Sequence, residues 1–290
     1  MVKTVLKITL SIIVYTIVFV IANAILPFSP GFKELGASED PAGILFILLN
    51  ATWICFTVYF IIRHTHISGK KLFLNLLFVM FFVQCFMTQI ETLFFTSAFP
   101  VLTKTDVILI MAAGLIPLLA AIPLLMKFFQ HKGDTGESVV IQKQALKPKS
   151  IIFKLGIIGI IYLFVYMIFG YFVAWQFEEL RIFYSGSAEK VGFFGQMINN
   201  FKANPVIFPF QIIRGILFAV FIIPLVNMVN KNKLIFVISV CLVYLCTAIV
   251  LIIPNALFPD MVRYGHLFEM TSSMLVFGII VGNIMSPKAG

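Results

Sequence analysis

The chain has 290 residues, of which 61% are hydrophobic and 11% are charged, and its formal net charge is +9. A soluble domain carries roughly 25% charged residues, so this chain is too apolar to be a soluble enzyme. Its cysteines lie inside apolar runs without metal-type spacing, which also excludes a disulfide scaffold. We therefore expect the chain to be embedded in the lipid bilayer, which is its predicted partner.

Eight apolar runs follow one another along the chain. A helix needs roughly 20 apolar residues to cross about 30 Å of hydrocarbon, and each run has about this length. The runs are continuously apolar, whereas a barrel strand would be shorter and would alternate. The sequence thus predicts an all-α polytopic transmembrane helix bundle. The eight predicted spans are residues 5–26, 43–62, 72–90, 106–128, 151–174, 206–228, 234–253 and 265–285.

The distribution of lysine and arginine predicts the orientation. The termini and loops expected on one side hold 14 of the 21 basic residues but only two of the 12 acidic residues. Since an excess of basic residues marks the cytoplasmic face, both termini are predicted to be cytoplasmic, and the positive charge indicates no nucleic-acid partner. The excess of 17 lysines over four arginines favours the plasma membrane of a bacterium. The first span is longer than the roughly 7–15 residues of a signal-peptide core, so we expect it to be retained.

A polar stretch at residues 130–150 divides four spans from four. We expect a first four-span half at 1–129, a cytoplasmic linker at 130–150 and a second half at 151–290. Within the second half, apolar residues at helical spacing predict an interfacial helix near 188–202 on the outer side.

Lysine and tyrosine recur at matching places in the two halves. Lys7 and Tyr15 of the first span correspond to Lys154 and Tyr162 of the fifth. This match allows two parallel halves of the kind that some transporters use, although hydrophobic helices that start with lysine also align by chance.

Ionisable side chains within the spans are the strongest indication of function. Each costs about 2.5 to 3.5 kcal/mol on insertion scales and needs a partner, water or a function. They all fall in the outer halves of their spans, so we infer one outward-facing polar cavity lined by the third, fifth, sixth and eighth spans. The predicted solute-binding residues are Arg214, Gln211, Glu91, Gln84, Gln89, His266, Glu269 and Arg263.

Helical spacing places several of these residues on shared stripes. Gln84 and Glu91 are seven positions apart in the third span, and Arg263, His266 and Glu269 recur every three positions in the eighth. Arg214 lies about 13 Å deep in the sixth span at 1.5 Å per residue. Its permanent charge must be matched by an acid or must bind an anion.

The first functional hypothesis is binding or translocation of a small polar or amphipathic solute, such as an anion or a lipid headgroup. Arg214 would receive the anion, and His266 with the carboxylates would relay protons. A simpler interpretation is an internal ion pair of Arg214 with Glu91 or Glu269 that only orients the helices.

The second hypothesis is a membrane-embedded hydrolase or transferase, with Glu178, Glu179, His266 and Glu269 as catalytic candidates. Paired glutamates followed by an arginine resemble the CAAX-protease and bacteriocin-processing family of eight-span proteins. However, Arg181 follows Glu179 by only two positions, against four in that family, and Met270 stands where its HxxxN element has asparagine. The sequence therefore does not place the chain in that family.

A metal centre is not expected. His266 and Glu269 form only a His-x-x-Glu pattern, which lacks the second histidine of zinc proteases, so we expect no metal and no other cofactor.

A third hypothesis is a structural or regulatory membrane subunit. Gly278 and Gly282 form a GxxxG pattern in the last span, which suits close helix packing and is the candidate oligomer contact.

Overall fold

The computed structural model describes residues 2–36, 43–130, 148–229, 232–255 and 257–286, so most of the expected linker at 130–150 lies outside them. The described residues form helices without strands, and eight helices are long and apolar enough to cross a membrane. The predicted all-α bundle with eight spans is confirmed, and it fits an integral membrane protein.

Each predicted span corresponds to one long helix or to a stack of consecutive helices. The third span consists of α4, the π-helical turn η1 and α5, and α10 continues into α11 in the sixth. The spans are α1 (Val2–Ile25), α3 (Gly43–His64), α4 (Gly69–Met80) with η1 (Phe81–Phe86) and α5 (Met87–Phe94), α6 (Lys104–Phe129), α7 (Pro148–Phe172), α10 (Ile207–Phe221) with α11 (Ile223–Met228), α12 (Lys233–Ile249) and α13 (Asp260–Met285).

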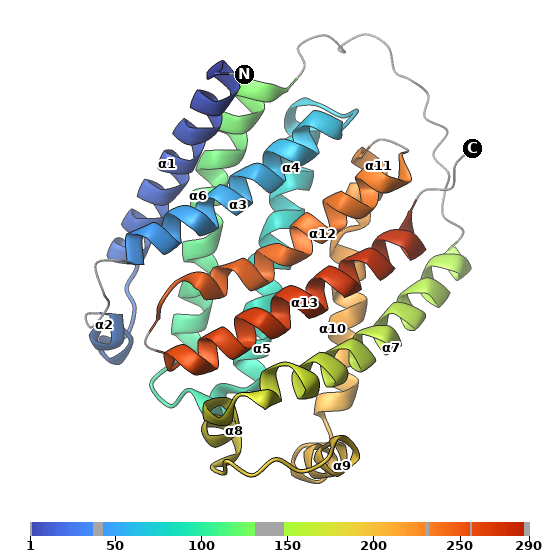
Figure 1. Cartoon of the computed structure of the whole chain (residues 1–290). Coiled ribbons are helices and arrows are strands. Elements are labelled where there is room, and N and C mark those ends of the chain that lie inside the picture. Colours follow the sequence, from blue (N-terminus) through green and yellow to red (C-terminus); the bar gives the residue numbers. More distant parts are fainter. Residues whose placement is uncertain (1, 37–42, 131–147, 230–231, 256, 287–290) are drawn as a thin grey trace.

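Shorter helices lie at the ends of the spans or between them. They are α2 (Pro30–Gly36), η2 (Thr96–Ala98), η3 (Ala174–Gln176), α8 (Glu178–Ser185), α9 (Phe193–Ala203) and η4 (Val250–Ile252). Helix α9 occupies the region where an interfacial helix is expected. Helix α1 begins and α13 ends at one end of the bundle, which we call the terminal end, and α2, α8 and α9 lie at the opposite end (Figure 1). That the terminal end faces the cytoplasm stays a prediction.

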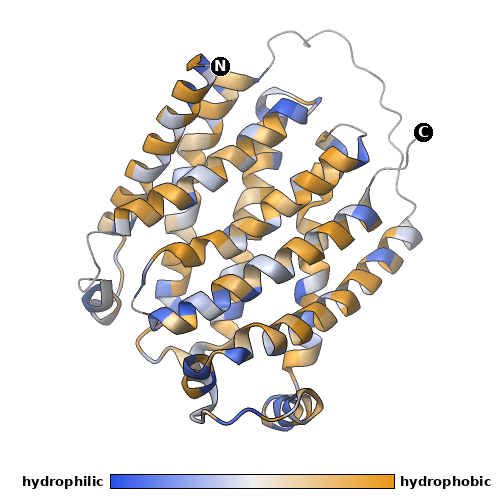
Figure 2. Ribbon diagram, viewed as in Figure 1, coloured by the Kyte–Doolittle hydropathy of each residue, from blue (hydrophilic) through white to orange (hydrophobic). Residues whose placement is uncertain are grey.

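The long helices form two layers (Figure 1). In one layer α3, α12, α13 and α7 lie side by side, and in the other α1, α6, the α4–η1–α5 stack and α10 do so. Helices α1 and α3 close one side, α7 and α10 close the other, and α12 packs on η1 in the middle. Hydrophobic residues dominate the long helices, while hydrophilic residues gather in the short helices and at the helix ends (Figure 2). This distribution suits lipid around the bundle.

The helix order in the two layers is the order that a parallel duplication would produce. A twofold rotation that exchanges the two layers would superpose the helices of the first half on those of the second. The corresponding pairs would be α1 with α7, α3 with α10, the α4–α5 stack with α12, and α6 with α13. The neighbours α1–α6 and α1–α3 then correspond to the neighbours α7–α13 and α7–α10. The two equivalent connections meet at the terminal end, where Thr65 Oγ1 and the His66 amide donate to the Met228 carbonyl at 2.6 and 3.1 Å. The duplication itself stays a prediction.

Within the described ranges, the packing of α3 on α6 has no counterpart of similar extent between α10 and α13. The backbones of α3 and α6 lie close together, whereas those of the equivalent α10 and α13 are further apart in the described residues. The rings of Phe218 and Phe277 bridge this wider space, with 6.0 Å between their centroids. Large side chains therefore have room between α10 and α13.

The start of α6 is held by a buried carboxylate. Asp106, which is 1% exposed, accepts hydrogen bonds from the amide and hydroxyl of Ser29, both at 2.8 Å. It also accepts from the Thr103 amide at 3.0 Å and from the Thr103 hydroxyl at 2.6 Å, which completes a capping box. The connection after α1 is thereby fastened to α6.

Two glycine contacts bring helices close together inside the chain. A Cβ atom on Gly278 would lie 3.1 Å from the Cys241 Cα, and one on Gly282 would lie 3.0 Å from the Val237 Cα. Both glycines are buried against α12. The GxxxG face expected to form an oligomer contact is therefore packed within the chain and is not open to a second copy.

Replacing Gly215 with alanine is expected to destabilise the bundle. Its new Cβ would clash with the Tyr162 Cβ and would lie 3.0 Å from the Gly159 Cα, so α7 and α10 would have to separate. Such overpacking costs about 1–3 kcal/mol. The matched control is Gly156→Ala in α7, where an added Cβ meets no atom within 4 Å. We expect a lower midpoint of thermal unfolding in detergent only for Gly215→Ala; equal midpoints would contradict this packing.

Candidate functional site

Arg214 of α10 and Glu91 of α5 form an ion pair that joins the two halves. Arg214 Nη1 donates to Glu91 Oε1 and Nη2 donates to Glu91 Oε2, both at 2.7 Å. The Arg214 side chain is 1% exposed, whereas that of Glu91 is 26% exposed. Nη1 also donates to Gln211 Oε1 at 2.9 Å, and Nη2 donates to the Met87 carbonyl at 3.4 Å. The guanidinium therefore meets one of the two acids considered from the sequence.

Aromatic rings enclose the rest of the guanidinium. Its central carbon lies 5.6 Å from the ring centroid of Tyr162, 5.8 Å from that of Phe210 and 6.0 Å from that of Phe218. These ring faces favour a cation. Both terminal nitrogens of Arg214 are already bonded, so an anion would have to displace Glu91 to reach them. The predicted role of Arg214 as a free anion receptor therefore gains no support from this geometry.

The π-helical turn η1 separates residues that the sequence places on one stripe. A π turn adds a residue to the helical turn and so rotates the residues that follow it. Glu91 faces Arg214, whereas Gln84 lies beside Tyr15 of α1. Gly114 of α6 makes room for the turn, because a Cβ there would clash with Cys85 Sγ. Gln84 therefore belongs to a different buried cluster from Glu91.

Glu269 of α13 is a buried acid without a paired cation among the described residues. Its side chain is 6% exposed, and its one described hydrogen bond comes from the Ser273 hydroxyl at 3.3 Å. Glu91 and Arg214 lie within Coulombic range of it but form no hydrogen bond with it. Glu269 therefore adjoins the ion pair and adds a carboxyl group that the pair does not neutralise.

His266 lies one turn before Glu269 and contacts Tyr184 of α8. The Tyr184 hydroxyl and His266 Nε2 are 3.0 Å apart, and the Phe258 ring lies 5.6 Å from the imidazole. The packing around the Tyr184 hydroxyl raises its pKa above the ordinary value, and the charges of Glu91 and Glu269 act in the same direction. This hydroxyl therefore stays protonated near neutral pH. Sequence reasoning missed Tyr184, because its position opposite His266 follows only from the packing of α8 on α13.

The Arg263 guanidinium lies at the end of η4 and makes none of its hydrogen bonds to the other predicted cavity residues in the described structure. Its Nη1 donates to the carbonyls of Leu251 and Ile252 at 3.1 and 3.0 Å, and its Nη2 donates to Asp260 at 2.8 Å. It caps the end of η4, where carbonyls without helical partners need donors. These bonds account for Arg263 structurally, and its expected solute-binding role gains no support from them.

The other charged residues near the opposite end also fall outside the cluster. Arg181 donates to the carbonyls of Ala188, Trp175 and Gln176 and thereby fixes the connection around α8. Glu178 and Glu179 are exposed in the first turn of α8, where the helix dipole favours acids. Gln89 is a further predicted residue near Glu91, and its Oε1 is buried without a hydrogen-bond partner.

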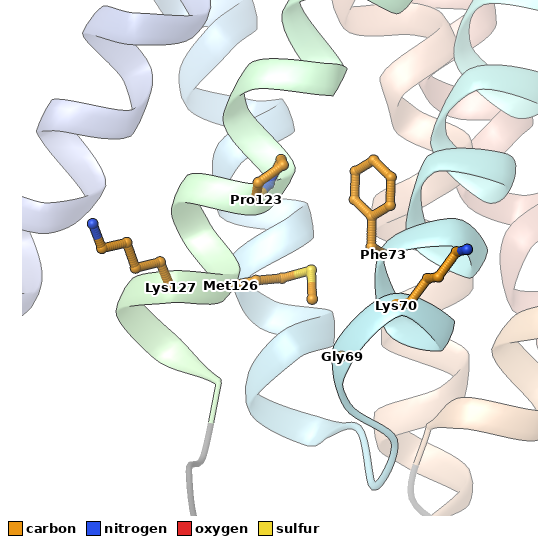
Figure 3. A pocket seen from close by; sticks show the side chains of 6 residues that line it. All are labelled: Gly69, Lys70, Phe73, Pro123, Met126 and Lys127. Carbon is orange, nitrogen blue, oxygen red and sulfur yellow. The ribbon is translucent and has the colours of Figure 1, made fainter.

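A pocket of about 490 Å³ lies at the other end of the bundle, between α4 and α6. Phe73, Pro123 and Met126 point toward it, whereas the amino groups of Lys70 and Lys127 point away (Figure 3). Its walls offer hydrocarbon contacts and no acid. This pocket was not expected from the sequence, because its residues form no polar pattern.

The structure contains no grouping of three or more histidine, cysteine or carboxylate side chains that could hold a metal ion within the described ranges. Comparison with protein-family models, with curated proteins and with solved structures found no match to this chain. The site itself is therefore the basis for inferring a function.

Proposed function

We propose that this membrane protein binds a small polar or amphipathic solute beside Arg214, Glu91 and Glu269 and moves it across the bilayer. The observation that carries the proposal is the buried Glu269 carboxyl, which adjoins a complete Arg214–Glu91 pair and has no cation of its own among the residues that the structure describes. An intramembrane ionisable group of this kind points to a functional site.

A purely structural role explains the cluster less well. A buried ion pair is seldom more stabilising than apolar side chains of similar size, because desolvation offsets the attraction. Gln211 Nε2, Gln89 Oε1 and Arg214 Nε are buried without partners among the described residues. Such groups usually bond to water or to a ligand. The partial exposure of Glu91 supports access from outside the bundle.

The charge balance favours a particular kind of solute. The Arg214–Glu91 pair is neutral as a unit, and Glu269 contributes only acid. A solute with a positively charged nitrogen or with hydrogen-bond donors would complement this set better than an anion would. This is the reverse of the anion preference considered from the sequence.

The position of the pair supports movement of the solute. Arg214 belongs to the second half and Glu91 to the first, so a shift of one half against the other would break their bonds. In transporters built from repeats, the substrate site lies at the interface between the repeats.

The proposal predicts that a bound solute stabilises the purified protein. The panel is ethanolamine, choline, glutamate, lactate, glucose and a short-chain phosphatidylethanolamine. At 100 times its Kd, a ligand stabilises by about 2.7 kcal/mol, which raises the midpoint of thermal unfolding. We expect ethanolamine or choline to raise it for the wild type and for the control Glu178→Gln, whose side chain is exposed, but not for Glu269→Gln. No shift with any compound, or an equal shift in Glu269→Gln, would contradict the proposal.

The hydrolase hypothesis has no specific observation in its favour. In the described residues His266 bonds to Tyr184 and not to a carboxylate, and neither Glu178 nor Glu179 has a described partner. A base oriented by a neighbouring acid is the arrangement that this chemistry needs.

A further inference from the structure

We infer that Glu269 is a proton-binding site inside the bundle, and that its proton exchanges with the opposite end through His266 and Tyr184. This deepens the proposed function by naming the ion that the solute would replace. The exchange of proton for solute rests on the proposed function, whereas protonation of Glu269 does not.

The surroundings of Glu269 favour its neutral form. Glu269 is the tenth residue of α13, about 14 Å along the helix from Asp260 at 1.5 Å per residue. Its side chain is 6% exposed and accepts one hydrogen bond, from Ser273, which a neutral carboxyl also accepts. An ionised carboxylate removed from water without a cation is strongly disfavoured. A bound proton removes this cost.

Within the described part of the chain, no neighbouring helix supplies a free positive charge to Glu269. Arg214 is the nearest cation in Coulombic range, but both of its terminal nitrogens bond to Glu91, and Glu91 repels a second negative charge. Helix α12 contributes no charged group in this range within the described residues. The ionisable groups in range of Glu269 are Glu91 of α5, Arg214 of α10, Tyr162 and Tyr166 of α7 and Tyr184 of α8, and His266 stands three positions before it on α13.

His266 and Tyr184 stand between this carboxyl and the opposite end. His266 stands three positions before Glu269, so the two side chains neighbour each other on one face of α13. Its ring reaches the Tyr184 hydroxyl at 3.0 Å, and Tyr184 is 36% exposed. A rotamer change of either side chain would bring the Glu269 carboxyl to one ring nitrogen of His266, which takes up H⁺. The other nitrogen passes H⁺ to Tyr184, whose own hydroxyl proton leaves to water. A cationic solute that takes the place of this proton leaves the charge of the site unchanged.

Infrared difference spectroscopy of the full chain in liposomes tests the inference. Titration from neutral to alkaline pH should remove a carbonyl-stretch band of a protonated carboxyl. We expect this band in the wild type and in the exposed control Glu178→Gln, and its loss in Glu269→Gln. An unchanged band in Glu269→Gln, or no such band in the wild type, would overturn the inference.

Two further variants keep the test independent of folding defects. Ser273→Ala removes the hydroxyl that donates to Glu269 and does not change the charge of the site. The band should shift to higher frequency, because the carbonyl loses a hydrogen bond. Tyr184→Phe should slow the exchange of the band in D₂O, because it interrupts the path at the exposed end. A band that neither shifts in Ser273→Ala nor exchanges more slowly in Tyr184→Phe would contradict the assignment. Because the spectra require no solute, failure of the solute panel would leave them unaffected.

Discussion

Replacing Glu91 with glutamine is expected to reduce accumulation of the protein in the membrane severely. The substitution leaves the Arg214 guanidinium 1% exposed and without a countercharge. Removing one partner of a buried ion pair costs about 3–5 kcal/mol, which is a large fraction of a typical folding free energy of about 5–15 kcal/mol. Arg214→Met should have a similar effect, because it leaves Glu91 without a cation. The measurement is the amount of folded protein after detergent extraction and size-exclusion chromatography.

The double variant Arg214→Met/Glu91→Leu should recover most of the folded protein. Apolar side chains of similar volume replace a buried ion pair at little cost, since no unpaired charge remains. The rings of Tyr162, Phe210 and Phe218 that surround the guanidinium can pack against methionine. Single variants that accumulate like the wild type would show that the pair is absent in the membrane.

Replacing Asp106 with alanine is the second substitution with a large expected effect. It removes four hydrogen bonds from Ser29 and Thr103 to one buried carboxylate. Hydrogen bonds to charged groups contribute about 1.5–3 kcal/mol each, and they are not additive here because they share one acceptor. We expect a loss of about 3 kcal/mol or more in the free energy of unfolding, measured by denaturant titration in detergent.

Asp260→Ala is the matched control for this loss. Asp260 is 73% exposed and bonds to Arg263, whose Nη1 keeps its bonds to the carbonyls of Leu251 and Ile252. Because Asp260 itself is exposed to water and Arg263 keeps two carbonyl acceptors, we expect a smaller loss than in Asp106→Ala. Equal losses in the two variants would argue against Asp106 as the fastening point of α1 and α6.

The eight spans were predictable because a helix in hydrocarbon pairs its own backbone N–H and C=O groups and needs an uninterrupted run of apolar side chains. The turn η1 was not predictable, since Phe81 to Phe86 read as ordinary helix, and it changes the direction in which Gln84 points. The breaks that divide α10 from α11 and α12 from η4 also leave no interruption in hydropathy.

The candidate site was predictable in part. The charge of Arg214 required an acid, but only the placement of α5 beside α10 shows that this acid is Glu91 and not Glu269. Arg263 looked like a cavity residue because its bonding partners are backbone carbonyls at a helix end, which the sequence does not display. Arg181 likewise bonds to backbone carbonyls, so its structural role could not be predicted from the sequence.

The most direct test of the account is the effect of ethanolamine and choline on thermal unfolding of Arg214→Met/Glu91→Leu. This variant keeps the apolar packing and Glu269 but lacks the neighbouring ion pair. If the charged cluster is the solute site, a compound that raises the unfolding midpoint of the wild type should leave this folded variant unchanged. A preserved shift would contradict the account, because Arg214 and Glu91 would then only hold the helices together.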